Sequence, residues 1–308
     1  MDTGHDKLAH YTQILSPAPS DEFLAGLPVP QPWSQALDYL RASLAQNPRA
    51  QVGEIGVDKS FRLPIHSGLA GGERENCAAW RELSGFRTGM EHQRRVFMDQ
   101  LRVAVEMERG VSVHSVQCHG VVYDCLRQLG EESHCKVSKK EHKRRNARGK
   151  KTLDEGSDGV GNAEIEGEKG DNTNNHDADN TAAAATENNN DNPLNPPRIC
   201  IHSASLSPST LSQYLSLSLP LHVYFSFSLV INARYGAKLL DLIRAVPDDR
   251  ILIESDFHSE GEQRRMLLDG IARVVLGVKG WEVEQGVGIL ERNWERFVYG
   301  ERAEVGGG

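Results

Sequence analysis

The sequence has no feature that would place the chain in a membrane or mark it for secretion. It holds no uninterrupted run of about 18 apolar residues, the length that a membrane-spanning helix needs. Its first thirty residues contain no positively charged start followed by an apolar stretch, as a signal peptide would. The five cysteines form no C-x-x-C pair, and their odd number disfavours a closed set of disulfides. We therefore expect a soluble protein of a reducing compartment, cytoplasmic, nuclear or both.

Motifs of several common protein classes are also missing. The sequence contains no G-x-S-x-G elbow, which disfavours a hydrolase with a serine nucleophile. It contains no Walker-type loop and no G-x-G-x-x-G, the usual phosphate-binding loops. The formal net charge of −8 at pH 7 disfavours a protein that coats nucleic acid. If the chain binds nucleic acid, it must therefore do so at a local site.

The composition divides the chain into two globular parts, residues 1–130 and 198–300, an insertion at residues 131–197 and a tail at residues 301–308. Between Lys136 and Lys151 the insertion has nine lysines or arginines and one acid, and from Asp154 to Asp191 it has eleven acids and one base. Such a segment buries too little apolar surface to offset the entropy cost of ordering it, so we predict a disordered, low-complexity insertion. Its basic block suits nucleic-acid binding or nuclear import, but a solvated linker is the commoner explanation of a charge run.

The globular parts alternate short apolar runs with helical patterns. Such alternation predicts an α/β fold with a parallel sheet covered on both faces, either doubly wound or closed into a barrel. The predicted strands cover Gln51–Val57, Val111–Val116, Arg198–Ser203, His222–Leu229 and Arg250–Ser255. The predicted helices include Trp33–Ala45, His92–Glu106 and Pro208–Leu219, and two more follow the last strand.

Four of these strands carry or end in a side chain able to bind a metal ion, namely Glu54, His114, His202 and Asp256. The C-terminal ends of parallel strands open on one mouth, so these side chains can meet although they are distant in sequence. Imidazole and carboxylate together suit Zn²⁺, Mn²⁺ or Mg²⁺, and such a metal lowers the pKa of a bound water to roughly 7. Each residue taken singly also has a structural explanation, for example Asp256 as a helix N-cap. The coincidence of four favours a metal site.

The segments that carry these residues are similar to motifs of a known family. The run V-G-E-I-G-V-D from Val52 is close to a G-E-I-G-L-D strand, and I-L-I-E-S-D from Ile251 to an L-x-E-T-D strand. Further similar segments are His92–Glu106, Val111–Ser115, Ile199–Ser203 and Asn293–Phe297. Together they resemble the TatD family of metal-dependent hydrolases. The extended forms D-K-S-F-R-L-P and E-S-D-F-H resemble its fungal branch, which is named for interacting with a subunit of the anaphase-promoting complex.

The resemblance implies a TIM-type (β/α) barrel that hydrolyses phosphodiesters, typically of DNA, with two divalent ions (Mg, Mn or Zn). By match, Glu54 would bridge the two ions, and His114 and His202 would bind one of them. Asp256 would be a further ligand and the general base for the attacking water. Glu54 and Asp256 are thus the predicted catalytic residues. DNA or another phosphodiester is the expected substrate, and an anaphase-promoting-complex subunit the expected protein partner.

One departure from the family pattern concerns the start of the barrel. The family begins with a strand that carries His-x-His, and no such strand is evident here, because His5 and His10 are five residues apart outside an apolar run. The second barrel strand is not evident either, and before residue 50 we expect at most a loop and one helix. We therefore predict a barrel that lacks its first two strands. Two functions stay open: a metal-dependent phosphodiesterase, or an interaction protein that has lost catalysis.

Overall fold

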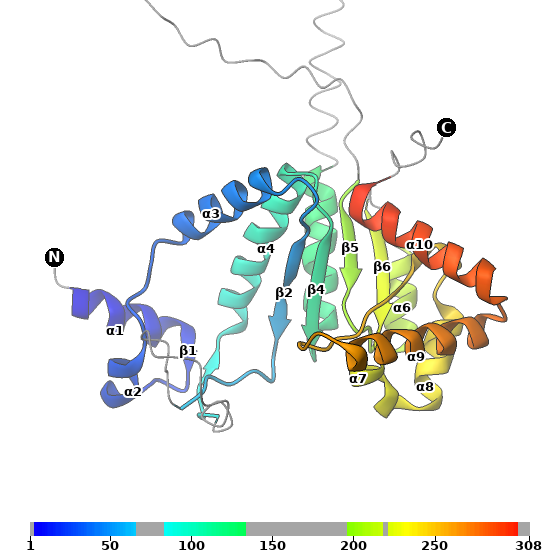
Figure 1. Cartoon of the computed structure of the whole chain (residues 1–308). Coiled ribbons are helices and arrows are strands. Elements are labelled where there is room, and N and C mark those ends of the chain that lie inside the picture. Colours follow the sequence, from blue (N-terminus) through cyan, green and yellow to red (C-terminus); the bar gives the residue numbers. More distant parts are fainter. Residues whose placement is uncertain (1–2, 66–82, 134–195, 218–220, 301–308) are drawn as a thin grey trace, which may run out of the picture. The chain divides into compact units, whose positions relative to one another are not determined.

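The computed structural model describes residues 3–65, 83–133, 196–217 and 221–300 (Figure 1). Contacts divide the chain into two compact units, one made of Met1–His134 with Asn195–Gly308 and the other of Cys135–Leu194. All described residues belong to the first unit. Of the insertion predicted at residues 131–197, only residues 131–133 and 196–197 are described, and the tail predicted at residues 301–308 lies outside the described residues.

Five parallel strands form the central sheet, in the order β2, β4, β5, β6 and β7. These strands are β2 (Val52–Asp58), β4 (Val111–Val116), β5 (Arg198–Ile201), β6 (His222–Phe227) and β7 (Ile251–Ile253). A doubly wound sheet reverses its strand order at a switch point, whereas the strands of a barrel follow one another in one direction. The observed order never reverses. It confirms the predicted α/β fold and is that of a TIM-type barrel, with β2 and β7 as the edge strands of the described sheet.

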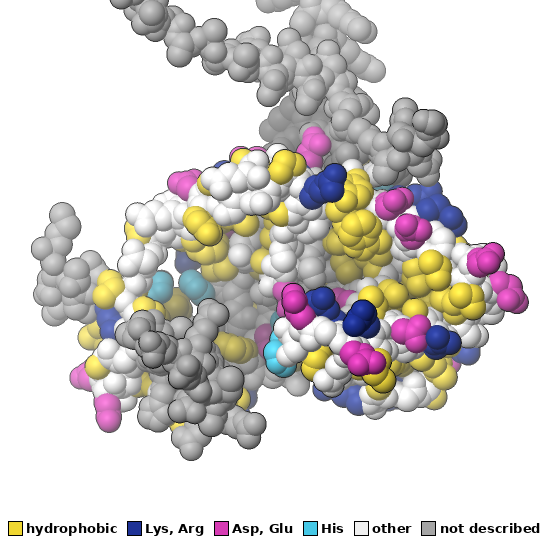
Figure 2. All heavy atoms as spheres, in the orientation of Figure 1, with side chains coloured by type: hydrophobic (Ala, Val, Ile, Leu, Met, Phe, Trp, Pro, Cys, Tyr) yellow, Lys and Arg dark blue, Asp and Glu magenta, His cyan; other side chains and the backbone are white. Residues whose placement is uncertain are grey.

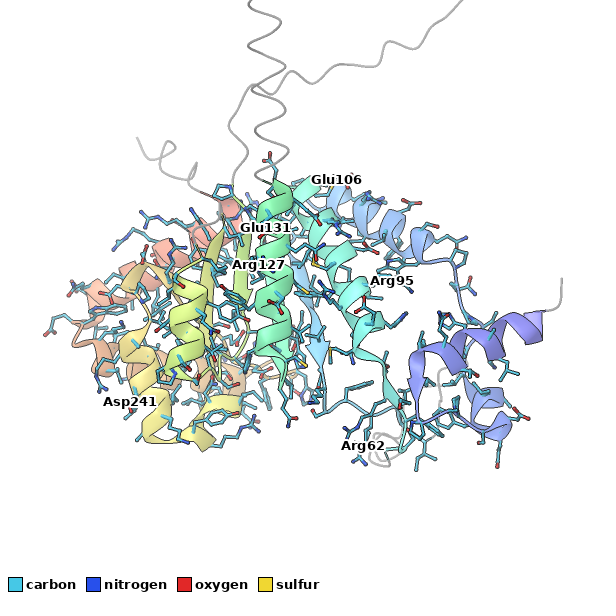
Figure 3. The ribbon with its side chains drawn as sticks, turned by 180° about the vertical axis from the view of Figure 1, so that it is seen from behind. Arg62, Arg95, Glu106, Arg127, Glu131 and Asp241 are labelled. Atoms are coloured by element: carbon cyan, nitrogen blue, oxygen red, sulfur yellow. The ribbon has the colours of Figure 1, made fainter. Side chains whose placement is uncertain are left out.

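One face of this sheet is covered by the helices that connect the strands (Figures 1 and 3). The connecting helices are α4 (Met90–Glu106), the helix of residues 119–133, α6 (Pro208–Leu215) and α8 (Ala237–Ala245). Helix α3 (Trp33–Gln46) precedes β2, and α9 (Glu262–Lys279) and α10 (Val283–Tyr299) follow β7. Buried strand residues such as Val113, Ile201 and Phe225 share a core with Phe97 of α4 and Leu126. Helix α6 ends at Leu215, four residues earlier than predicted, at a Ser216 whose N–H bonds back to Ser212.

The other face of the sheet is covered in part by the C-terminal end of α10. Strand side chains alternate between faces, so the neighbours of the core residues point to this side. Cys200, Tyr224 and Leu252 form a second cluster there with Phe297 and Val298 of α10. The rings of Tyr224 and Phe297 meet edge to face at 5.6 Å. Each strand from β5 to β7 is therefore buried on both faces, as a parallel sheet requires.

The region before Trp33 differs from the sequence prediction of a loop alone. It holds α1 (Thr3–Ile14) and α2 (Asp21–Gly26), together with β1 (Leu15–Ser16), which pairs antiparallel with β3 (Arg87–Thr88). Leu15, Leu24 and Leu27 form a small core of their own. The prediction was wrong because these helices are short or largely polar, and part of their surroundings comes from far along the chain, where Phe86 contacts Phe23 and β3 pairs with β1. None of the described helices is long and apolar enough to cross a membrane.

Candidate metal centre

The four side chains predicted at the strand ends lie next to one another. Glu54 stands on β2 and His114 on β4, while His202 follows β5 directly and Asp256 lies three residues beyond β7. Glu54 Oε1 is 2.9 Å from His114 Nδ1 and 3.5 Å from His202 Nε2. Asp256 Oδ1 is 3.4 Å from His202 Nε2. Four separate segments thus bring together two imidazoles and two carboxylates: Glu54 and His114 lie within β2 and β4, whereas His202 and Asp256 lie just beyond β5 and β7.

These four residues line a cavity of about 700 Å³. That volume is in the range of sites that hold a small molecule or part of a polymer. The other lining residues are Ser115, Val116, Gln117, His119, Ser203, Ser205, Ile231, Arg234 and Tyr235. Arg234 lies over the Tyr235 ring at 5.1 Å. The rim therefore offers one cation and one aromatic ring beside a centre of two carboxylates.

His202 is the most enclosed of the four, and carboxylates surround it. Burial by itself would lower the pKa of its imidazole, but the hydrogen bond and charge of Glu254, followed by the charges of Glu54 and Asp256, raise the pKa to about 9. Glu254 Oε2 accepts the Nδ1 hydrogen bond at 2.7 Å, so the Nε2 atom is left to face Glu54 and Asp256. A carboxylate on one ring nitrogen is the usual way of orienting the other toward a metal.

Glu254 is in turn held by three hydrogen bonds to one carboxylate oxygen. Its Oε1 accepts from the Ser203 backbone N–H at 2.6 Å, the Ser203 hydroxyl at 2.8 Å and the Ser226 hydroxyl at 2.9 Å. Burial alone would raise the pKa of Glu254, but the bonds from His202, Ser203 and Ser226 outweigh it and lower that pKa. Glu254 is therefore a fixed anion that sets the orientation of His202.

Asp58, at the end of β2, anchors the other histidine. Its Oδ1 accepts from the Ser60 backbone N–H and hydroxyl at 2.7 Å each and from the Phe61 N–H at 3.0 Å. Its Oδ2 lies 3.5 Å from His114 Nε2. Burial acts to raise the pKa of Asp58, but these hydrogen bonds together lower it. The two ring nitrogens of His114 thus face two carboxylates: Nδ1 faces Glu54 and Nε2 faces Asp58.

Gln93 of α4 fixes the end of β2 from the helix layer. Its side-chain oxygen accepts from the Asp58 N–H at 2.8 Å, and its amide nitrogen donates to the Asp58 carbonyl at 3.1 Å and the Thr88 carbonyl at 2.9 Å. These three bonds use both donors of the amide and one of its two acceptor positions. They hold the end of β2, the strand that carries Glu54 into the cavity.

Backbone strain gathers at the same mouth. Gln117, Ser203 and Asp256 have positive φ angles of 55°, 41° and 48°, and all three line the cavity. Left-handed backbone is unfavourable for residues other than glycine and persists where the surrounding structure enforces it, often at functional sites. The Oδ2 atom of Asp256 lies 3.2 Å from Ser203 Oγ, whose single proton has a shorter contact, 2.8 Å, with Glu254 Oε1.

Comparison with known proteins connects this geometry to a family. The profile described as "TatD related DNase" matches residues 17–156 and 174–299, which is most of the chain. The chain belongs to the TatD-related DNase family. This confirms the resemblance that the strand motifs indicated, and the matched ranges include all four side chains of the centre.

Two fungal proteins are similar in sequence to this TatD-family chain. The Cut9-interacting protein scn1 of Schizosaccharomyces pombe is 31% identical over 292 residues, which is 95% of this chain and 75% of the relative. An uncharacterized deoxyribonuclease of Saccharomyces cerevisiae is 29% identical over 126 residues, covering 40% of this chain and 38% of the relative.

Two solved structures were also found for this TatD-family chain. A TatD homologue of Escherichia coli K12 matches with a TM-score of 0.48 at 14% identity, over 86% of this chain and 70% of that one. An uncharacterized amidohydrolase of Saccharomyces cerevisiae matches with a TM-score of 0.44 at 12% identity, over 85% and 70%. Family membership rests on the sequence matches.

Two further residues, Asp58 and Glu254, belong to this TatD-family centre but were not predicted from the sequence. Asp58 and Glu254 stand inside the very motifs that carry Glu54 and Asp256, and both contact a histidine of the centre. Their positions in those motifs were the sequence signal from which their role at the site could have been predicted. Among the described residues, no group of three or more His, Cys, Asp or Glu side chains is arranged as a finished metal site. The nearest nitrogen and oxygen atoms instead pair with one another as hydrogen bonds.

Proposed function

We propose that the chain is a metal-dependent phosphodiesterase of the DNase type. The observation that carries this proposal is the meeting of Glu54, His114, His202 and Asp256 at one cavity in a member of a DNase family. The four residues come from four segments on or just after different strands, and each is ordinary by itself. Their convergence on a pocket of substrate size supports a reaction centre rather than four separate structural roles.

The donor set fits a divalent cation. Tetrahedral ligands at bond lengths of about 2.0–2.1 Å stand about 3.3–3.4 Å apart, close to the 3.4 Å and 3.5 Å that separate His202 Nε2 from Asp256 and Glu54. A set of imidazole and carboxylate ligands suits Zn²⁺ and Mn²⁺. Mg²⁺ prefers a set with a larger share of oxygen ligands. Glu54, His114, His202 and Asp256 would hold the ion. When bound, it acidifies water at neutral pH and offsets charge on the phosphodiester oxygens.

The remaining steps of this proposal fall to the chain's own groups. Asp256, whose Oδ1 lies 3.4 Å from His202 Nε2, accepts the proton of the attacking water. Glu254 holds the His202 ring so that its Nε2 stays directed at Glu54 and Asp256. Arg234 at the rim attracts the phosphate backbone to a centre that is otherwise rich in carboxylates.

A hydrolysis assay with a matched pair of variants tests this function. After chelation, the purified chain should cleave a single-stranded oligonucleotide only when Mn²⁺, Mg²⁺ or Zn²⁺ is restored. Glu54→Ala should abolish the activity and the stoichiometric metal found by elemental analysis. Glu291→Ala, which removes an exposed glutamate of α10, should change neither. Cleavage that persists in Glu54→Ala, or a folded wild type that binds no metal and cleaves nothing, contradicts the proposal.

A second candidate function is the binding of a protein partner. A relative that is 31% identical is named for its interaction with Cut9, and we propose a subunit of the anaphase-promoting complex as the partner. Helix α10 exposes Val283, Val287 and Trp294 at 68%, 52% and 50%. By their spacing these three lie on one face of the helix, and Figure 2 shows hydrophobic side chains gathered in this region.

This second function is tested by calorimetry with the purified Cut9-type subunit. Trp294→Ala combined with Val287→Glu should abolish binding, because it removes an aromatic anchor and puts a charge into an apolar contact. Tyr39→Ala, which truncates an aromatic side chain 76% exposed on α3, should leave binding unchanged. No binding by the wild type, or equal loss in both variants, would exclude this surface.

A further inference from the structure

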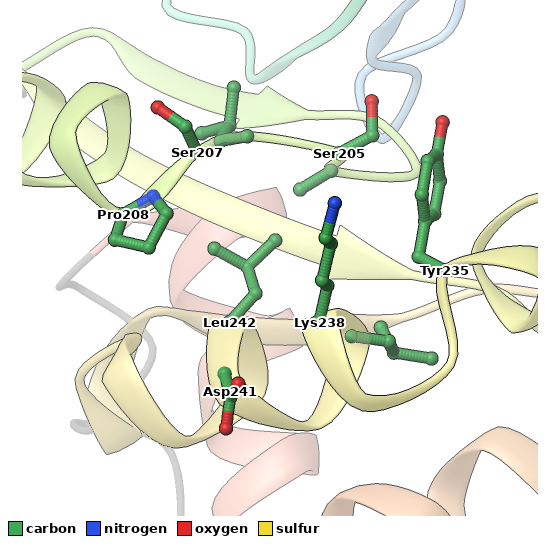
Figure 4. Close-up of a pocket in the computed structure, with 10 residues that line it drawn as sticks. Ser205, Ser207, Pro208, Tyr235, Lys238, Asp241 and Leu242 are labelled. Carbon is green, nitrogen blue, oxygen red and sulfur yellow. The ribbon is translucent and has the colours of Figure 1, made fainter.

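A second cavity adjoins the metal centre. It has a volume of about 450 Å³ and lies between the start of α6 and helix α8 (Figure 4). Ser205 and Tyr235 line both this cavity and the one that holds the four metal-binding candidates. A ligand whose charged group reaches the centre can therefore place its next group in the second cavity.

The walls of this second cavity are mostly apolar. Ala204, Leu206, Leu239 and Leu242 are buried side chains that form its interior, and Pro208 closes one side. The Tyr235 ring stands at the junction of the two cavities. Apolar walls with an aromatic ring at the entrance suit a flat, weakly polar group such as a nucleobase, which packs its face on such surfaces.

Lys238 supplies a positive charge at the entrance. Its side chain rises from α8 between Leu242 and Tyr235 toward Ser205 (Figure 4). Asp241, the acid in the lining, pairs with Arg244 at 2.8 Å, and no described carboxylate forms an ion pair with Lys238. Arg234 lines the first cavity and Lys238 the second, on either side of the shared residue Tyr235, so each cavity has one such cation in its lining. These cations match the negative charge of a phosphate next to the base.

We propose that the second cavity binds the nucleoside next to the scissile phosphodiester, with its base against Leu206 and Leu239 and its phosphate at Lys238. This inference rests on the proposed function and names the substrate class of the same site. A peptide or a simple anion is less suitable, because the apolar interior and the cationic entrance must be matched at once. The chain then selects nucleotides over phosphodiesters that lack a base.

Calorimetric titration of the full chain with thymidine 5′-monophosphate and with 2-deoxyribose 5-phosphate tests the proposal. The nucleotide should bind at least about tenfold more tightly, because only it fills the apolar interior. Lys238→Glu should weaken nucleotide binding by about tenfold or more, since it reverses the charge that meets the phosphate. Arg273→Glu, which reverses an exposed arginine of α9 that lines neither cavity, is the matched control and should bind like the wild type.

The possible outcomes separate this inference from the proposed function. Equal affinity for the two ligands, or equal losses in Lys238→Glu and Arg273→Glu, overturns the nucleoside site even if the chain cleaves oligonucleotides. Tight, Lys238-dependent nucleotide binding supports the site even if no cleavage is found. Lys238 is exposed, so its variants are expected to fold, and circular dichroism of each variant checks this.

Discussion

At the scale of single residues, the two glycines of the V-G-E-I-G-V-D run have different tasks. A side chain at Gly56 would overlap the backbone of His114 on the neighbouring strand, whereas one at Gly53 would meet nothing within 4 Å. Close approach of β2 and β4 thus requires a glycine at position 56 only. This approach also brings Glu54 within hydrogen-bonding distance of His114.

We expect Gly56→Ala to destabilise the fold by about 1–3 kcal/mol, the usual cost of overpacking. Gly53→Ala on the same strand is the control and should stay close to the wild type. Urea unfolding of the three proteins measures the difference. Equal stability of the two variants would show that β4 can move aside freely.

His92 should make the stability of the chain sensitive to mild acid. Burial, followed by the positive charges of Arg95 and His10, lowers the pKa of His92 below its usual 6.5, and no described group hydrogen-bonds to its Nδ1. The unfolded chain then binds the proton more readily than the folded one. The stabilising effect is full above pH 6.5 and is lost as the pH falls through the folded-state pKa.

The measurement is the urea midpoint between about pH 7 and about pH 5. His92→Leu should reduce the fall in the midpoint over this interval. His258→Leu, which replaces an exposed histidine, should leave the fall unchanged. A slope in His92→Leu equal to that of the wild type would assign the acid sensitivity to other groups.

At the scale of elements, α10 is attached to the sheet by two polar side chains. Asn293 donates to the carbonyls of Asp248 and Ile251 at 2.7 and 2.9 Å, just where β7 begins. Arg198 of β5, only 4% exposed, donates to the Phe297 carbonyl at 2.7 Å and the Glu108 carbonyl at 2.9 Å. The last carbonyls of a helix lack partners within it and carry the negative end of its dipole, so a buried guanidinium is favourable there.

Arg198→Met should therefore cost about 2–4 kcal/mol of unfolding free energy, because the buried carbonyls lose their donor. Arg273→Met, which removes an arginine 77% exposed on α9, should leave stability unchanged. Guanidinium unfolding monitored by circular dichroism compares the two. A similar small effect in both variants would mean that water replaces the guanidinium.

Which elements could be predicted depended on where their stabilising contacts lie. The strands around Ile55, Val113 and Ile201 are buried in the core and are therefore apolar. Their apolar runs in the sequence were enough to predict them. Helices α1 and α2 were missed, because they are short or largely polar and their contacts include remote partners, such as Phe86 against Phe23 and β3 against β1. Sequence patterns record local preference and burial, and they do not record which remote segment supplies a partner.

At the scale of the whole molecule, the convergence of the four ligand candidates was predictable from strand direction. Parallel strands end on one side, so His202 and Asp256, just beyond β5 and β7, were expected to face one mouth, whereas Glu54 joins them from the third residue of β2. The second cavity could not be predicted. Its lining joins the loop after β5 with Tyr235 and helix α8, and no strand periodicity fixes the path of such loops.

The central claim is that these strand ends hold one divalent ion between them, and anomalous diffraction from a crystal soaked in Mn²⁺ tests it most directly. The predicted result is a strong peak in the cavity, about 2.0–2.3 Å from atoms of Glu54, His114, His202 and Asp256. A well-ordered crystal that shows no peak there, or shows the ion bound by other residues, would contradict the claim.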